Sequence, residues 1–149
     1  AKYFFWEGPS VAGRPKPHRT KRTDERKRMT HSDEITKAIG AHGKWKRRLQ
    51  AVIEEGRSDV PPERVEPDNL CDFGRWLYSL SPADQNSEYF RKVQSMHASF
   101  HREAAKVLRL ALSGQKAAAE KCMAFGGPFA NASADLTITM MDWKKAVGG

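Results

Sequence analysis

Cysteine is scarce in this sequence, which contains only Cys71 and Cys122 among its 149 residues. Two thiols in a chain with long helical patterns do not make the disulfide framework of a small secreted domain. No apolar run approaches the roughly 20 residues of a membrane-spanning helix, and the first residues lack the charged, apolar and small-residue order that is typical of a signal peptide. These absences predict a reduced, cytoplasmic protein with no membrane insertion.

Basic residues exceed acidic ones, but the excess is concentrated near the start of the chain. The formal net charge is +8, and residues 1–29 hold nine Lys and Arg residues against three Asp and Glu residues. The rest of the chain has seventeen basic and fifteen acidic residues, so it is close to neutral. A nearly neutral globular part does not offer the basic face that binds phosphate backbones, so we expect no nucleic-acid partner.

Residues 1–29 combine several glycines and prolines with a charged run and contain few aliphatic side chains. Such a composition does not bury enough apolar surface to offset the entropy of ordering the chain. We therefore predict a basic, disordered arm or linker over residues 1–29, followed by one folded domain over residues 30–147.

Apolar residues recur at intervals of three or four through most of this domain, as in amphipathic helices. A loop is expected over residues 58–67, because Pro61 and Pro62 interrupt a helix. Ser87 is expected to cap the longest helix, in which no glycine or proline occurs. The predicted fold is all-α: an antiparallel four-helix bundle with an extra short helix. The expected helices cover residues 30–55, 68–80, 81–84 (the extra short one), 87–112 and 115–147, the last broken or kinked at 126–128.

His97 and His101 lie four residues apart near the middle of the helix predicted over residues 87–112. Residues at this spacing share one helix face with Cβ atoms about 5–6 Å apart, so both imidazoles can reach one ion. Phe90 and Leu108 mark the same face as the buried one. A buried imidazole still needs hydrogen-bond partners, so the alternative to a metal site is a pair of hydrogen-bonded core histidines.

Two further residues of ligand type are expected to face the core. His42 lies on the apolar stripe of the first helix, and Cys71 lies near the start of the helix over 68–80, where the helix dipole favours a thiolate. Three imidazole nitrogens and one sulfur are a normal set for tetrahedral zinc. A thiolate disfavours magnesium and calcium, and no carboxylate cluster is present for a di-iron pair. Four protein ligands leave no open position for hydrolysis, so we expect no enzyme activity.

Three segments of the chain resemble the signature of the chemoreceptor zinc-binding (CZB) domain. They are His42-Gly43-Lys44-Trp45, Cys71-Asp72-Phe73-Gly74-Arg75-Trp76 and His97-Ala98-Ser99-Phe100-His101, which occur in the order and at the intervals of that family, within residues 32–145. The resemblance implies a helical bundle that binds Zn²⁺ through His42, Cys71, His97 and His101.

The resemblance also implies a biological setting. Domains of this kind are often homodimers and are regulatory parts of bacterial chemoreceptors and cyclic-di-GMP enzymes, and their cysteine is linked to zinc and hypochlorite sensing. The expected partners are therefore a second copy and a signalling output domain or protein. We expect the dimer to form through an apolar stripe that the packing of the bundle leaves uncovered. The aromatic residues expected there are Trp76, Phe129 and Trp143.

Two other functions stay open at this point. A hemerythrin-like metal-binding bundle would use iron or oxygen chemistry, but it needs further inward His, Glu or Asp ligands, and the sequence offers none. A metal-free helical interaction module would use the same histidines only as core residues.

Overall fold

The computed structural model describes the backbone of residues 22–148 and the side chains of residues 31–148. Residues 1–21 of the predicted arm lie outside the described residues. Within the described part of the chain there are eight α-helices and no strand, which confirms the all-α class. No described helix combines the length and the apolar character needed to cross a membrane.

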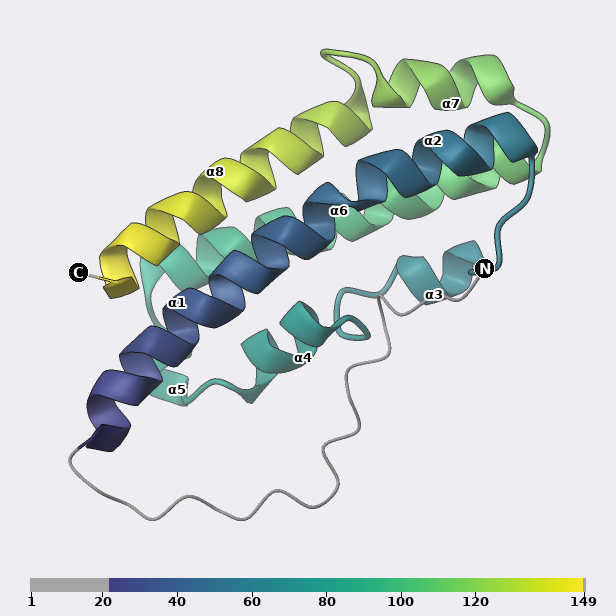
Figure 1. Cartoon of the computed structure of the whole chain (residues 1–149). Helices are drawn as coiled ribbons and strands as arrows, with labels where there is room; N and C mark the ends of the chain where they lie inside the picture. Colours follow the sequence, from purple (N-terminus) through teal and green to yellow (C-terminus); the bar gives the residue numbers. More distant parts are fainter. Residues whose placement is uncertain (1–21, 149) are drawn as a thin grey trace.

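The described chain crosses the molecule in four passes of alternating direction (Figure 1). Three passes contain a long helix, whereas the second is made of three short helices. Two of these were predicted, over residues 68–80 and 81–84, and the one that precedes them was not. The first pass is α1 (Arg22–Gly43) and α2 (Trp45–Glu55), the second α3 (Pro62–Val65), α4 (Asp72–Ser79) and α5 (Pro82–Gln85), the third α6 (Glu88–Leu112), and the fourth α7 (Lys116–Met123) and α8 (Pro128–Gly148).

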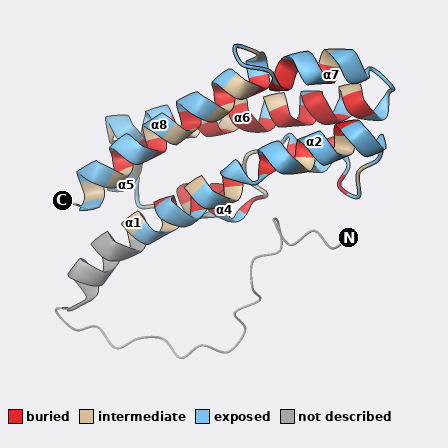
Figure 2. Ribbon diagram, turned by 45° about the horizontal axis from the view of Figure 1, so that its top comes forward, coloured by how far each residue is buried: buried red, intermediate tan, exposed pale blue. Residues whose placement is uncertain are grey.

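Helix α6 is the centre of the fold and packs against α2, α3, α7 and α8. Its buried residues recur every three or four positions, as the sequence predicted, and include Phe90, Val93, Phe100 and Leu108. Burying a side chain of this size contributes roughly 1.5–3 kcal/mol. Figure 2 shows the buried faces of the long helices turned toward one another. The same spacing places His97 and His101 inside this core, where both are fully buried.

Side-chain caps define where α5 and α6 begin. The hydroxyl of Ser87 accepts a hydrogen bond from the backbone N–H of Phe90 at 3.0 Å, which confirms the cap predicted for α6. Ser81 accepts from the N–H of Asp84 at 3.2 Å and starts α5 in the same way. Each cap satisfies one of the N–H groups that a helix N-terminus leaves without an intrahelical partner, and typically contributes about 1 kcal/mol.

The first pass differs from its prediction at both ends of α1. The helix begins at Arg22, several residues before the predicted start, because the run from Arg22 to Arg28 contains no glycine or proline and is rich in good helix formers. The pass is also divided at Lys44, although the N–H of Lys44 donates to the carbonyl of Gly40 at 3.3 Å and the N–H of Arg48 donates to the carbonyl of Lys44 at 3.2 Å. The helical hydrogen bonds therefore continue through the division.

The loop prediction over residues 58–67 is wrong in its second half, where α3 forms. Pro62 occupies the first position of this helix, where a missing N–H costs nothing and the fixed φ angle suits the turn. The last residue of α3, Val65, is fully buried. The short helix thus fixes a backbone segment beside α6, which matters for the site described next.

Candidate metal centre

The structure brings together all four predicted ligand residues. His42 lies in the last turn of α1, Cys71 immediately precedes α4, and His97 and His101 lie in the middle of α6. None of the four is more than 3% exposed. Their ligand atoms all lie within 4.8 Å of one another. Three passes of the chain therefore meet at one buried point.

The spacing of these atoms suits a four-coordinate ion. Nε2 of His97 lies 3.1 Å from Nε2 of His42 and 2.9 Å from Nε2 of His101. Sγ of Cys71 lies 3.3 Å from Nε2 of His97 and 3.6 Å from Nε2 of His101. Tetrahedral bonds of about 2.0–2.1 Å to nitrogen and 2.3 Å to sulfur place two nitrogens roughly 3.3 Å apart and a nitrogen and a sulfur roughly 3.6 Å apart. The observed distances are close to these values.

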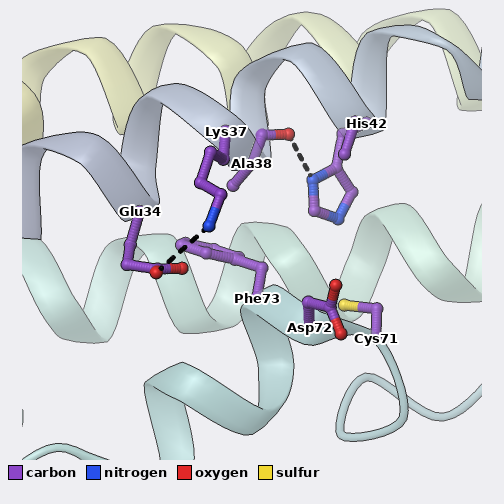
Figure 3. A pocket seen from close by; sticks show the side chains of 8 residues that line it. Glu34, Lys37, Ala38, His42, Cys71, Asp72 and Phe73 are labelled. Atoms are coloured by element: carbon purple, nitrogen blue, oxygen red, sulfur yellow. Dashed lines mark hydrogen bonds and ion pairs between the residues drawn. The ribbon is translucent and has the colours of Figure 1, made fainter. Parts of the chain in front are cut away.

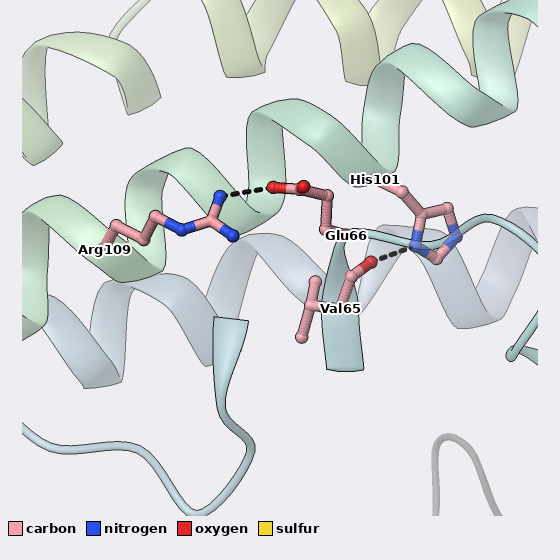
Figure 4. Close-up of polar contacts among 4 residues, drawn as sticks. All are labelled: Val65, Glu66, His101 and Arg109. Carbon is pink, nitrogen blue, oxygen red and sulfur yellow. Dashed lines mark hydrogen bonds and ion pairs between the residues drawn. The ribbon is translucent and has the colours of Figure 1, made fainter. Parts of the chain in front are cut away.

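Backbone carbonyls fix the orientation of two of the imidazoles. Nδ1–H of His42 donates to the carbonyl of Ala38 at 2.7 Å, and Nδ1–H of His101 donates to the carbonyl of Val65 at 2.8 Å (Figure 4). A proton on Nδ1 leaves the Nε2 lone pair free to face the cluster, which is the usual arrangement around a metal-binding histidine. The backbone alone therefore orients both rings with an unprotonated Nε2 toward the cluster.

Within the cluster, the groups that can donate a hydrogen bond are fewer than the close contacts between the four ligand atoms. Nε2 of both His42 and His101 carries a lone pair, so only the Cys71 thiol and one tautomer of His97 can donate. Nδ1 of His97 is itself buried and has no hydrogen-bond partner among the described residues. A cation would accept all four lone pairs at once, whereas a purely hydrogen-bonded core leaves part of them unsatisfied, which is costly in a buried site. The donor set therefore fits a metal ion better than a core of paired histidines.

Burial keeps the imidazoles neutral. It lowers the pKa of His42 to about 3, with a further lowering from the nearby charge of His101, and it lowers the pKa of His101 to about 4. Burial also lowers the pKa of His97 well below its ordinary value. At neutral pH all three rings thus carry a lone pair that is available to an ion.

Cys71 behaves differently from the sequence prediction. Its sulfur caps α4 and accepts a hydrogen bond from the N–H of Gly74 at 3.3 Å. This bond and the N–H of Phe73 favour the thiolate, but burial outweighs them and raises the pKa of Cys71 to about 12. The helix N-terminus alone therefore does not ionise the thiol, and a bound cation is what would hold it as a thiolate.

Gly74 is required by the loop that precedes α4. A Cβ atom at this position would lie 1.8 Å from the carbonyl oxygen of Asp68, a backbone atom that cannot move alone. The chain's own preceding loop therefore leaves no room for a side chain at this position. Because the N–H of Gly74 also contacts the Cys71 sulfur, this tight turn positions the ligand.

A set of supporting residues was not predicted from the sequence. Figure 4 shows the Arg109 side chain of α6 in an ion pair with Glu66, which follows Val65 directly. The pair ties the end of α3 to α6 beside the carbonyl that accepts from His101. Nothing in the sequence indicates that a basic and an acidic residue 43 positions apart form an ion pair. The Val65 carbonyl could not be predicted either, because every residue has a backbone carbonyl.

No second group of three or more His, Cys, Asp or Glu residues converges within the part of the chain that the structure describes. No carboxylate belongs to the cluster itself, so it lacks the ligands of a di-iron centre. Three nitrogens and one sulfur are instead the ligands of a closed zinc site.

Comparison with known protein families finds a match. Residues 42–108 match the family model of the chemoreceptor zinc-binding domain, which confirms the resemblance noted in the sequence. The matched span begins at His42 and contains all four clustered residues, although it is shorter than the span of residues 32–145 over which the motifs were compared. Neither the curated proteins nor the solved structures include a match to this chain.

Proposed function

Because residues 42–108 match the chemoreceptor zinc-binding domain, we propose that this chain is a zinc-binding sensory or regulatory domain of bacterial signalling that acts in the cytoplasm and has no catalysis of its own. The observation that carries the proposal is the convergence of three Nε2 atoms and one Sγ atom on a single buried point. His42, Cys71, His97 and His101 would hold Zn²⁺, which supplies a cross-link between parts of the chain far apart in sequence.

The cross-link gives the domain two states. With the ion bound, the end of α1, the start of α4 and the middle of α6 are held together; without it, only packing and hydrogen bonds hold α4 in place. Metal binding to the folded state alone stabilises that state by mass action, by roughly 2.7 kcal/mol at a metal concentration 100 times Kd. Because the second pass consists of short helices, its docking is the property that zinc would control.

Cys71 gives the site a second input. In the proposed response to hypochlorite, the oxidant's oxygen is transferred to the Cys71 thiolate, two electrons pass from sulfur to chlorine, and chloride leaves; the product is a sulfenate. A sulfenate is a weaker ligand than a thiolate, so this change would loosen α4 from α6. The imidazole ligands resist this oxidation, which leaves Cys71 as the responsive ligand.

A second copy of the chain is the proposed partner of the surface formed by α8 and the neighbouring part of α1. Of the three aromatic residues that the sequence suggested for a dimer interface, Phe129 and Trp143 are buried in the core instead, and Trp76 is partly buried and packed against that core. Ile138 and Met141 of α8 are exposed by 60% and 49%. They lie on one helix face, since residues three apart are neighbours on a helix. Chemoreceptor signalling and cyclic-di-GMP control are the two proposed outputs.

The test of zinc binding is elemental analysis of protein purified without added metal and then loaded with one equivalent of Zn²⁺. We expect one zinc per chain. Replacement by Co²⁺ should give the visible absorption of tetrahedral cobalt with sulfur ligation, which Cys71→Ser should alter. Protein that retains no zinc after dialysis, or cobalt spectra typical of octahedral oxygen ligation, would contradict the proposal.

A further inference from the structure

The buried centre has one side that is open to a pocket. A pocket of about 80 Å³ lies between α1 and the start of α4, and both His42 and Cys71 line it (Figure 3). His97 and His101 do not line this pocket, and both are fully buried. The pocket has room for several water molecules, since one water needs only about 10–15 Å³ of such volume. The four ligands are therefore unequal in their access to solvent.

The outer part of the pocket carries charge. Glu34 and Lys37 of α1 line it and form an ion pair at 3.5 Å, which Figure 3 shows beside the buried pair of ligands. The Lys37 side chain is 75% exposed and that of Glu34 is 28% exposed, so the carboxylate lies deeper than the ammonium. Asp72 adds a second carboxylate next to Cys71. A cation that enters the pocket would thus meet one ammonium and two carboxylates.

We propose that this pocket is the route by which a divalent cation reaches Cys71 and His42, and that Glu34 and Lys37 set the rate of its uptake. The inference rests on the proposed zinc-binding function. It follows that the cation should be exchanged at Cys71 and His42 before it is exchanged at His97 and His101, because only Cys71 and His42 face the route. Charged groups along a narrow path change association rates by raising or lowering the local concentration of a charged ligand.

Blocking the pocket tests the route. Ala41 of α1 lines it and is half-buried, so Ala41→Leu would fill much of its volume. Ala51 of α2 is exposed and does not line the pocket, so Ala51→Leu is the matched control. Uptake is measured by stopped-flow from a weak fluorescent zinc indicator, and release is measured into an excess of colorimetric chelator.

A blocked route changes the barrier and leaves its two end states alone. Ala41→Leu should therefore slow uptake and release by the same factor, at least about fivefold given the cost of displacing an overpacked side chain, with Kd unchanged. Ala51→Leu should leave both rates as in the wild type. Unchanged rates in Ala41→Leu, or faster release without slower uptake, would overturn the route.

The charge pair provides a test that does not depend on a bulky substitution. Glu34→Gln should slow uptake by about two- to fivefold at low salt, and Lys37→Gln should accelerate it by a similar factor; both effects should fade as salt is added. Shifts in the same direction, or shifts insensitive to salt, would overturn the role of the pair. Wild-type protein that does not bind zinc would refute the proposed function, whereas normal zinc binding with unaltered kinetics in all the variants would refute the route alone.

Discussion

The backbone carbonyl of Val65 accepts a hydrogen bond from Nδ1 of His101 at 2.8 Å, across 36 residues of sequence. Val65 ends a four-residue helix, and His101 lies in the middle of the longest one. This contact fixes the tautomer of His101 and so aims Nε2 at the cluster. The orientation of a ligand on α6 therefore depends on a segment whose sequence had predicted only a loop.

The first prediction concerns ligand identity. His97→Ala should reduce bound zinc from about one ion per chain to a small fraction, because three protein ligands remain where a structural site uses four. His31→Ala is the control, since His31 contacts Trp76 away from the cluster. Zinc content is read by elemental analysis after dialysis. Full zinc in His97→Ala combined with loss in His31→Ala would show that the ligand assignment is wrong.

The second prediction concerns protons. The pKa of Cys71 is raised to about 12, whereas the pKa values of His42 and His101 are lowered to about 3 and about 4. Near neutral pH the thiol is protonated and the imidazoles are not, so zinc binding should release one proton per site. Zinc affinity should then rise about tenfold for each unit of pH.

Calorimetry in two buffers of different ionisation enthalpy measures this release directly. Cys71→Ala should release no proton while retaining weaker metal binding. A release of two or more protons in the wild type would mean that the histidines are charged before the metal binds, contrary to their burial.

The third prediction compares two glycines. Gly74→Ala should destabilise the protein by about 1–3 kcal/mol, as overpacking does, and weaken zinc binding, because its Cβ would collide with the Asp68 carbonyl. Gly40→Ala meets nothing within 4 Å and should stabilise α1 by up to about 1 kcal/mol. Urea unfolding of both zinc-free variants measures the difference. Equal stability of the two variants would contradict the close approach at Gly74.

The fourth prediction concerns the link between α3 and α6. The Arg109–Glu66 ion pair is about half-exposed on both sides, with 46% exposure of each side chain. A double-mutant cycle of Arg109→Ala and Glu66→Ala should therefore give a coupling free energy of only about 0.2–1 kcal/mol. The same cycle applied to zinc affinity should give a coupling of the same sign, since the pair supports the Val65 carbonyl. Strictly additive losses would mean that the two side chains act separately.

The fifth prediction concerns the proposed dimer. Ile138→Glu should shift the sedimentation of the zinc-loaded protein from dimer to monomer, because a buried unpaired carboxylate is costly at an apolar interface. Leu112→Glu is the control, since Leu112 is also exposed but ends α6. A wild-type protein that is monomeric at high micromolar concentration with zinc bound would exclude the dimer.

The sequence was informative where local pattern determines structure. Ser87 and the three-to-four spacing predicted α6 and the inward placement of His97 and His101, and both are confirmed. It failed where a local signal has two interpretations and where the determinant is tertiary. Pro62 was interpreted as a helix breaker, although a proline also suits the first position of a helix. The raised pKa of Cys71 arises from burial by other parts of the chain, which no local motif near a helix N-terminus reports.

All four clustered residues precede residue 102, whereas α7 and α8 follow them. Since translation proceeds from the N-terminus, a ribosome completes the whole ligand set before it has made α8, the helix that covers α6 in the finished fold. The apolar face of α6 and all four clustered residues are therefore synthesised before α8, the helix that buries this face. In the proposed zinc-bound state, the cross-link would therefore depend on no residue of α7 or α8, the last helices to be made.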